Sequence, residues 1–144
     1  MGTLRDGRAV ELRAAAPADA AALETLRRSD PRQRELTGGH VTIAQVAGGA
    51  QPAGYGAWFD DGDFVCAVEE ALSGLGVGTL LLRNAAREAA EAGHETLSVE
   101  LAAGEHALAA MLRDCGLVSS WDLDHPIARV VLSLAATRPG WATP

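Results

Sequence analysis

The chain has 144 residues, of which 48% are hydrophobic, and this length suits one domain with a buried core. No apolar run is long enough to cross a bilayer, and residues 1–10 lack the apolar stretch of a signal peptide. The formal net charge of −7 argues against a nucleic-acid-binding surface. We therefore expect a single cytoplasmic domain over residues 1–144, with no membrane or nucleic-acid partner.

The first half of the chain predicts a strand, a helix and then an antiparallel meander. Residues 8–13 alternate like a strand. Pro17 is placed to open a helix that ends near Arg28, with Leu23 and Leu26 on its apolar face. The polar residues 31–39 suggest a short turn of helix. The meander strands are expected at residues 41–47, 54–59 and 63–68, with turns at 48–52 and 60–62.

The second half predicts a helix, a strand, a second helix and a hairpin. The strand at 96–101 must run parallel to the strand before the first helix, because such crossovers are right-handed. This order indicates the α/β (α+β) class, with a mixed sheet and helices on both faces. The first helix is expected over residues 80–92, with Leu81, Leu82, Ala85 and Ala89 facing inward and Gly93 as its cap. The later elements are expected at 105–114 (closed by Gly116), 121–123 and 127–134, before a frayed tail over 135–144.

Two cysteines fall inside predicted elements, Cys66 in a strand and Cys115 in a helix. We expect both to be small core residues rather than a disulfide. Neither has the neighbouring ligands that a metal site needs, so no metal is expected.

The segment Ser-Gly-Leu-Gly-Val-Gly-Thr at residues 73–79 is the most informative part of the chain. It lies between a predicted strand and a predicted helix, and its glycines stand at alternate positions. Missing Cβ atoms allow a ligand to reach the main chain, and consecutive N–H groups can form an anion-binding nest. Together with the positive end of the next helix dipole, the segment predicts a pyrophosphate-binding site.

Two common nucleotide motifs do not match this segment. A Walker-type loop requires a lysine after its last glycine, and the chain contains no lysine. The dinucleotide fingerprint requires a third glycine where this chain has Thr79 or Leu81, depending on the starting glycine.

The order and spacing of four segments resemble the GNAT superfamily of acyl-CoA-dependent N-acetyltransferases. The likeness covers residues 5–134, which we take as the domain core. Residues 10–20 resemble the opening strand and helix of the family, and residues 73–78 resemble its Q/R-x-x-G-x-G/A pyrophosphate loop. Residues 81–93 resemble the helix after that loop, and residues 105–117 resemble a later helix with its terminal Gly-Phe. Within the family, the chain is most similar to bacterial protein lysine acetyltransferases.

This resemblance implies a fold and a cofactor. The fold would be a mostly antiparallel sheet of six to seven strands, in which one parallel pair splays apart to admit acetyl-CoA. The strand before the loop would pair with the pantetheine amides, and the loop amides would bind the pyrophosphate. The implied cofactor-binding residues are Cys66, Ala67, Val68, Ser73, Gly74, Leu75, Gly76, Val77, Gly78 and Thr79.

Four positions depart from the family pattern. Ser73 replaces the usual Gln or Arg of the loop, and Leu75 replaces an arginine often found beside the middle glycine. Glu105 stands at the position of an asparagine, and Leu112 at that of a tyrosine that serves many members as general acid. The change at residue 75 would leave the main-chain amides to bind phosphate alone.

Three acidic residues are candidates for the chemistry. Asp63 matches a glutamate of the lysine-acetylating relatives and is the candidate base, although Asp60, Asp61 and Asp63 could simply form a solvated turn. An aspartate of ordinary pKa, about 4, would act through water rather than directly. Glu100 and Asp122 are candidates for binding the amine, with surface strand positions as the alternative.

The resemblance therefore predicts an acetyl-CoA-dependent N-acetyltransferase acting on an amine, either a protein lysine or a small cationic molecule. Two alternatives stay open: an acyl-CoA-binding or regulatory module without turnover, and an interaction domain without a cofactor. The sequence leaves the acceptor, the acyl length and self-association as a homodimer undetermined.

Overall fold

The computed structural model describes residues 2–28, 34–49, 51–72, 74–102, 105–117, 119–122 and 128–134. The predicted tail at 135–144 and the predicted turn at 124–126 lie outside this part of the chain. The elements are β1 (Gly2–Thr3), β2 (Ala9–Ala14), a 3₁₀ turn (Pro17–Asp19), α1 (Ala20–Arg28), β3 (His40–Val46), β4 (Gly54–Trp58), β5 (Phe64–Val68), a 3₁₀ turn (Glu70–Leu72), α2 (Val77–Glu91), β6 (Thr96–Leu101), α3 (His106–Asp114), β7 (Ser119–Asp122) and β8 (Ala128–Ser133).

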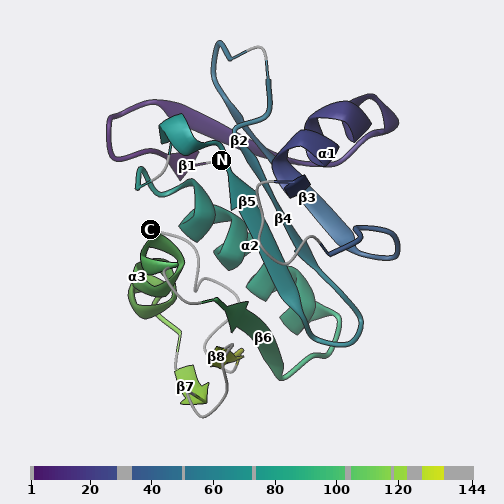
Figure 1. Cartoon of the computed structure of the whole chain (residues 1–144), viewed down its shortest axis with the longest axis vertical. Helices are drawn as coiled ribbons and strands as arrows, with labels where there is room; N and C mark the ends of the chain where they lie inside the picture. Colours follow the sequence, from purple (N-terminus) through teal and green to yellow (C-terminus); the bar gives the residue numbers. More distant parts are fainter. Residues whose placement is uncertain are drawn as a thin grey trace.

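The strands form two antiparallel sheets that meet at one edge (Figure 1). The first has the order β1-β2-β3-β4-β5 and contains the predicted meander, and the second has the order β6-β8-β7. An isolated parallel bridge between Asp63 and Ser98 links them, and the Ser98 N–H donates to the Gly62 carbonyl at 2.8 Å. In the described part of the chain this bridge is the one backbone pairing between the two sheets, so β5 and β6 separate beyond it; their ladders are with β4 and β8. The predicted fold class, including its parallel pair, is confirmed.

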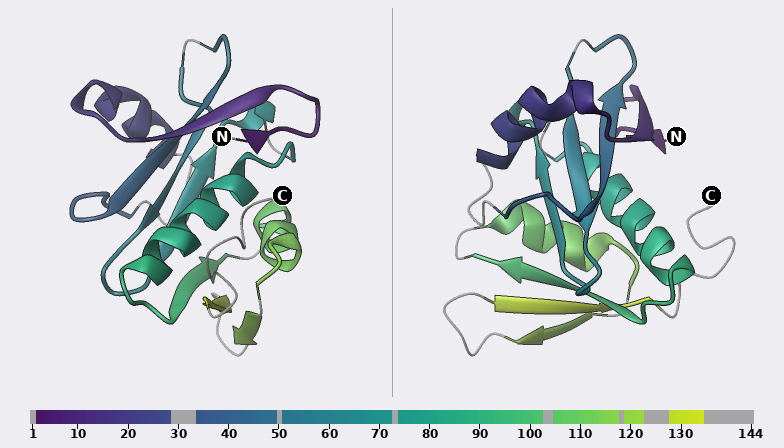
Figure 2. Two further views of the ribbon diagram at one scale, coloured as in Figure 1. Left: turned by 180° about the vertical axis from the view of Figure 1, so that it is seen from behind. Right: turned by 90° about the vertical axis from the view of Figure 1, so that its right-hand side faces the viewer.

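Helices cover both faces of the first sheet, as predicted (Figure 2). On one face, α2 buries Leu81, Leu82, Ala85 and Ala89, the four residues that the helical period places inward. On the other face, the half-buried Leu23 and Leu26 of α1 pack against a cluster of strand side chains. Gly93 caps α2 with φ of 98°, and the His94 N–H donates to the Ala89 carbonyl at 2.9 Å.

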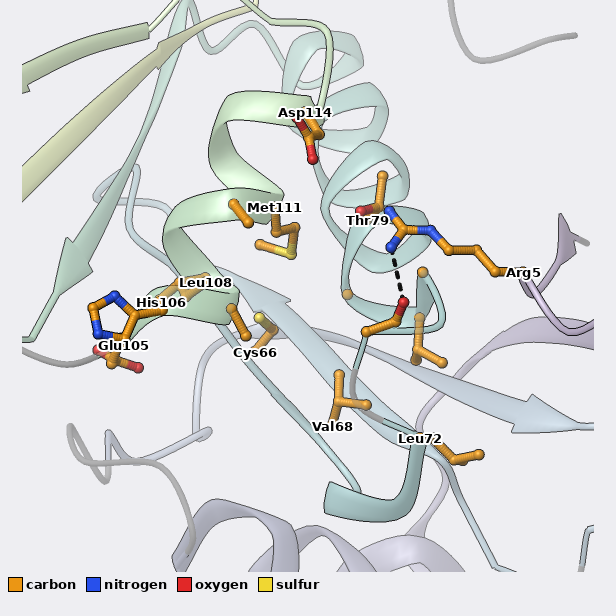
Figure 3. Close-up of a pocket in the computed structure, with 16 residues that line it drawn as sticks. Arg5, Cys66, Val68, Leu72, Thr79, Glu105, His106, Leu108, Met111 and Asp114 are labelled. Atoms are coloured by element: carbon orange, nitrogen blue, oxygen red, sulfur yellow. Dashed lines mark hydrogen bonds between the residues drawn. The ribbon is translucent and has the colours of Figure 1, made fainter.

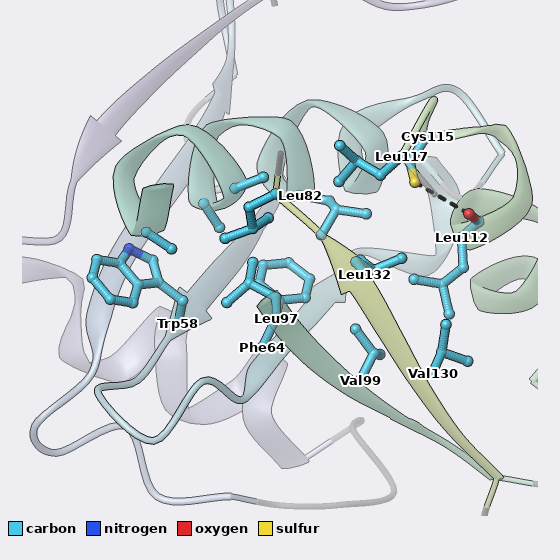
Figure 4. Packing of buried hydrophobic residues seen from close by; sticks show 14 residues of the cluster. Trp58, Phe64, Leu82, Leu97, Val99, Leu112, Cys115, Leu117, Val130 and Leu132 are labelled. Atoms are coloured by element: carbon cyan, nitrogen blue, oxygen red, sulfur yellow. Dashed lines mark hydrogen bonds between the residues drawn. The ribbon is translucent and has the colours of Figure 1, made fainter. Parts of the chain in front are cut away.

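The main hydrophobic core lies between α2, the second sheet and α3 (Figure 4). Phe64 of β5, Leu97 of β6 and Leu112 of α3 all belong to this cluster and are at most 1% exposed. Since both separating strands and α3 pack into the same core, the core holds the two sides of the opening at a fixed distance. Cys115 is also fully buried in it, and Cys66 and Cys115 are both free thiols.

Three short segments of the structure differ from the prediction. Residues 34–39 form a turn, in which the Gly39 N–H donates to the Leu36 carbonyl at 3.0 Å, rather than the expected turn of helix. The two-residue strand β1 and the 3₁₀ turn Glu70–Leu72 were not expected. Elements of two or three residues are too short to produce a periodic pattern, so only their tertiary contacts define them.

An ion pair ties the start of the first helix to β2. Arg13 donates from both terminal nitrogens to Asp19, at 2.7 and 2.8 Å, and the Ala16 N–H donates to the same carboxylate at 2.7 Å. The Asp19 side chain is 9% exposed. The Arg13 guanidinium, and then the Ala16 amide, lower the pKa of Asp19 to about 2.

We predict that replacing Asp19 by asparagine changes the acid sensitivity of the fold. The pKa of Asp19 is about 2 in the folded protein against an ordinary 3.8, so its ionised form stabilises the fold above about pH 4. This contribution is lost as the pH falls from about 4 to about 2. Asp19→Asn should therefore lower Tm at pH 7 and flatten the decrease of Tm between pH 4 and 2, measured by circular dichroism. Asp60→Asn, which changes a carboxylate that is 84% exposed, is the matched control and should behave like wild type. An unchanged pH profile in Asp19→Asn would contradict this account.

Candidate functional site

A pocket of about 370 Å³ opens between β5, the first turn of α2 and one face of α3 (Figure 3). Seven of the ten residues predicted to bind a cofactor line it: Cys66, Val68, Gly74, Gly76, Val77, Gly78 and Thr79. The structure thus brings the strand and the glycine-rich segment together around one cavity.

The other three predicted residues do not line this pocket in the described structure. Ala67 is buried on the opposite face of β5, against the cluster that contains Ile43 and Tyr55. Leu75 packs against the cluster that contains Leu4. Ser73 lies outside the described residues.

Helix α2 begins earlier than the sequence pattern indicates. It starts at Val77 rather than near Leu80, so Val77, Gly78 and Thr79 form its first turn instead of a loop. The N-cap residue is Gly76, with φ of 100°, and no side chain caps the helix. The first amides of a helix have no carbonyl partner within the helix, and the N-cap glycine has no side-chain oxygen to take that place; among the described residues no other side chain provides a cap. The first turn therefore presents N–H groups at the pocket, next to the positive end of the helix dipole.

The three glycines of the segment serve two different purposes. Gly74 and Gly76 have φ of 80° and 100°, and a Cβ at either position would meet no atom within 4 Å. They are needed for their backbone conformation, which other residues adopt only with strain. At Gly78 a Cβ would lie 2.7 Å from the Met111 Sδ, so this glycine allows α3 to approach the first turn of α2.

The main chain of β5 also faces the pocket. In the ladder with β4, the Phe59 N–H donates to the Asp63 carbonyl and the Glu69 N–H donates to the Ala53 carbonyl. Because hydrogen-bonded and non-hydrogen-bonded pairs alternate along an antiparallel ladder, Cys66 and Val68 occupy non-hydrogen-bonded positions. Their N–H and C=O groups are directed away from β4, toward the opening between β5 and β6.

Helix α3 supplies a wall of the pocket that sequence reasoning missed. The residues that it contributes include Ala107, Ala110, Met111 and Asp114, at the spacing i, i+3, i+4 and i+7. This spacing marks one face of a helix and could have indicated a surface apart from the core face. Glu105 and His106 at the start of α3 also line the pocket, and the Glu105 carboxylate accepts a hydrogen bond from the Ala102 N–H at 2.7 Å.

A second pocket, of about 300 Å³, lies at the bridge between the sheets. It is lined by Arg34, Asp63, Phe64, Val65, Ser98 and Glu100. Val65 and Cys66 are adjacent on β5 but belong to opposite faces, since Val65 packs in the α1-side cluster and Cys66 against the main core. The two pockets therefore meet β5 at neighbouring residues, and Phe64, which belongs to the main core like Cys66, also lines the second pocket.

The second pocket contains a network of charges. Arg34 Nη1 lies 2.5 Å from Asp63 Oδ2, and Arg129 Nη1 lies 3.7 Å from Asp63 Oδ1. Arg129 also pairs with Glu100 at 3.1 Å, and Arg34 pairs with Asp61 at 3.0 Å. The Asp63 amide, and then the Arg34 guanidinium, hold the pKa of Asp61 below its ordinary value. Asp63, the predicted base, is 29% exposed, and both of its oxygens contact guanidinium groups.

The structure brings two of the three predicted acidic residues together. Asp63 and Glu100 line the second pocket and share Arg129 as a partner. Asp122 is exposed on β7, as the cross-strand neighbour of Arg129, and does not line this pocket.

The described residues contain no group of three or more His, Cys, Asp or Glu side chains placed to hold a metal ion. None of the helices in this part of the chain combines the length and the apolar character required to span a bilayer.

No protein-family model and no curated protein matches the sequence. Solved structures do match. The GNAT domain of S. lividans PAT superimposes with a TM-score of 0.72 at 15% identity, over 92% of this chain and 94% of that domain. The yncA protein of Salmonella typhimurium, solved with its cofactor acetyl-CoA, gives 0.66 at 18% identity, over 91% and 99%. A variant of spermidine N-acetyltransferase SpeG from Vibrio cholerae gives 0.69 at 11% identity, over 90% and 96%. This chain has the fold of the GNAT acetyltransferases.

We predict that Gly76→Ala destabilises the protein, because alanine would have to adopt φ of 100° at the start of α2. The left-handed conformation costs about 1–2 kcal/mol for a residue with a Cβ. Urea unfolding should show a loss of that size in the free energy of unfolding. Gly38→Ala is the reference variant for the same backbone strain elsewhere in the chain, since Gly38 has φ of 80° with no atom near its Cβ position. Its free energy of unfolding should fall by a similar amount. A Gly76→Ala protein as stable as wild type would show that the backbone at this helix start is not fixed.

Proposed function

We propose that this protein is an acetyl-CoA-dependent N-acetyltransferase that transfers an acetyl group directly to an amine, either a protein lysine or a small cationic molecule. The observation that carries the proposal is the uncapped start of α2, which faces a pocket beside the outward edge of β5. The GNAT domain of PAT and the acetyl-CoA complex of yncA have the same fold and support it.

The residues of the first pocket fit acetyl-CoA. The first-turn amides of α2 suit a diphosphate, because they are uncapped donors at the positive end of a helix dipole. The outward-directed groups of Val68 suit the amides of the pantetheine, in the way that an added strand pairs with a sheet edge. Leu72, Leu108 and Met111 provide apolar contacts along the same cavity. When bound, acetyl-CoA supplies an acetyl group activated as a thioester.

The second pocket suits the acceptor amine, because it is lined by Phe64 and Val65, the residues of β5 next to Cys66 of the first pocket. Among the residues that line it, Asp63 and Glu100 carry two negative charges against the one positive charge of Arg34, which leaves one net negative charge. That balance favours a cationic substrate. The amine must lose a proton before it can act as a nucleophile. Since both Asp63 oxygens contact arginine, we expect a water molecule to carry the proton to this carboxylate.

A second candidate function is an acyl-CoA-binding module without turnover. Two observations favour it. Asp63 is engaged with two arginines, and Leu112, which stands at the position of the family's tyrosine, is fully buried in the core. With Leu112 in that place, α3 offers no hydroxyl there to protonate the leaving thiolate, and solvent would have to do so.

The two functions, and the alternative without any cofactor, are separated by two measurements on the same protein. Acetyl-CoA and CoA, but not NAD, should raise Tm, because a ligand of the native state stabilises it. The acetyltransferase should also release free thiol from acetyl-CoA in the presence of an amine panel that includes polyamines and lysine peptides. A shift of Tm without thiol release would favour the binding module. The absence of any shift would favour an interaction domain.

We predict that Asp63→Asn lowers kcat at least about tenfold, because general bases typically contribute a factor of 10² to 10⁴ and a water relay would weaken the effect. The Kd of acetyl-CoA should stay within about twofold, since Asp63 does not line the first pocket. Asp60→Asn is the matched control: Asp60 lies in the same turn, is 84% exposed and pairs with His40. Full activity of Asp63→Asn across the pH range would remove Asp63 from the mechanism.

A further inference from the structure

The N-terminal segment reaches the start of α2 through the main chain and the side chain of one residue. The Arg5 N–H donates to the Leu75 carbonyl at 3.0 Å, and Arg5 Nη1 donates to the Gly74 carbonyl at 2.9 Å (Figure 3). Arg5 is exposed and lines the first pocket. A guanidinium has five N–H donors in a planar arrangement, so the bond to Gly74 leaves donors that can reach a ligand.

The segment that presents Arg5 is held against α2. Leu4 is 3% exposed and packs in one cluster with Leu72, Val77 and Leu81. Its N–H donates to the Arg8 carbonyl at 2.8 Å, which closes the turn between β1 and β2. Arg5 therefore extends from an anchored turn, and its guanidinium needs little further ordering to contact a ligand.

The glycine-rich segment has no cation of its own among its described residues. Leu75 is half-buried against the same cluster as Leu4, so its side chain faces the core rather than the pocket. Leu75 and Leu4 thus pack together, and the residue after Leu4 carries the positive charge to the pocket. The glycine-rich segment thus supplies the apolar side chain of Leu75, and the N-terminal turn, which is far away in the sequence, supplies the cation, Arg5.

The charges around the first pocket make the Arg5 guanidinium important for binding an anion. Among the described residues that line it, Arg5 is the one arginine, whereas Glu105 and Asp114 are acidic. Arg5 and Thr79, which is in the first turn of α2, line the same pocket (Figure 3). An anionic ligand would be repelled by the two carboxylates and attracted by Arg5 and the helix start.

We propose that Arg5 binds the diphosphate of a CoA-type ligand together with the first-turn amides of α2. This inference rests on the proposed function and names the side chain that completes its cofactor site. Guanidinium groups bind phosphate oxygens through charge-assisted hydrogen bonds, and amides at a helix start bind the same group from the main chain. The N-terminal turn is then a part of the cofactor site rather than only an edge of the first sheet.

The test measures the Kd of CoA and of 3′-dephospho-CoA by calorimetry for wild type, Arg5→Ala, Arg5→Gln and Arg8→Ala. Arg5→Ala should weaken both ligands about tenfold, the size expected for one hydrogen bond between charged groups. Arg5→Gln keeps a donor for the Gly74 carbonyl but removes the charge, and it should weaken both ligands to a similar extent. Arg8→Ala, which removes an exposed arginine three positions further along the same turn, should stay within about twofold.

Each other outcome overturns the inference in a distinct way. If wild type binds CoA and both Arg5 variants bind it equally well, Arg5 has no such role and the proposed function stands. A loss confined to CoA, with 3′-dephospho-CoA unaffected, would move the contact to the 3′-phosphate. Full affinity in Arg5→Gln alone would show that the tie to Gly74 matters and the charge does not. If wild type binds neither ligand, both the inference and the proposed function fail.

Discussion

The parallel bridge between Asp63 and Ser98 is the constraint on which the architecture depends. It joins the residue before β5 to Ser98 within β6, and no further pairing between these two strands is present in the described residues beyond it. Two sheets that met along a full parallel ladder would use the outward edge of β5 for hydrogen bonds between strands. Here that edge faces a pocket, because the shared core of Phe64, Leu97 and Leu112 holds the second sheet at a distance. The separation of two strands thus converts ordinary sheet backbone into a surface that can bind a ligand.

The two pockets would bind their ligands through different kinds of interaction. The first combines main-chain donors at the start of α2 with apolar side chains of α3 and with one arginine from the N-terminal turn. The second is built from side-chain charges, in which Arg34 and Arg129 link Asp61, Asp63 and Glu100. Backbone donors have fixed positions that a change of side chain does not remove. A network of charged side chains is more easily altered by substitution. In proteins of this fold we therefore expect the residues of the second pocket, rather than those of the first, to differ with the acceptor.

Much of the fold could be predicted from sequence because its long elements carry clear periodic patterns. The inward face of α2 and the direction of β6 followed from helical spacing and crossover handedness alone. The sequence pattern places the start of α2 too late, because glycine is a weak helix former and the close packing of Gly78 against Met111 is visible only in the structure. The contact of Arg5 with Gly74 spans 69 residues, and that of Arg34 with Asp63 spans 29. No local pattern encodes contacts at such separations, so the arginines of both pockets emerged only from the structure, whereas Asp63 and Glu100 could be named from the sequence.

The presence of two separate pockets at neighbouring residues of β5 has a kinetic consequence for the proposed reaction. Val65 and Cys66 line different cavities, so a donor and an acceptor would enter by separate routes and neither would block the other. Such a layout suits a ternary complex in which both substrates are present before the first product leaves. In such a complex the acetyl group would pass directly from donor to acceptor, so the proposed reaction requires no covalent intermediate on a side chain of the protein.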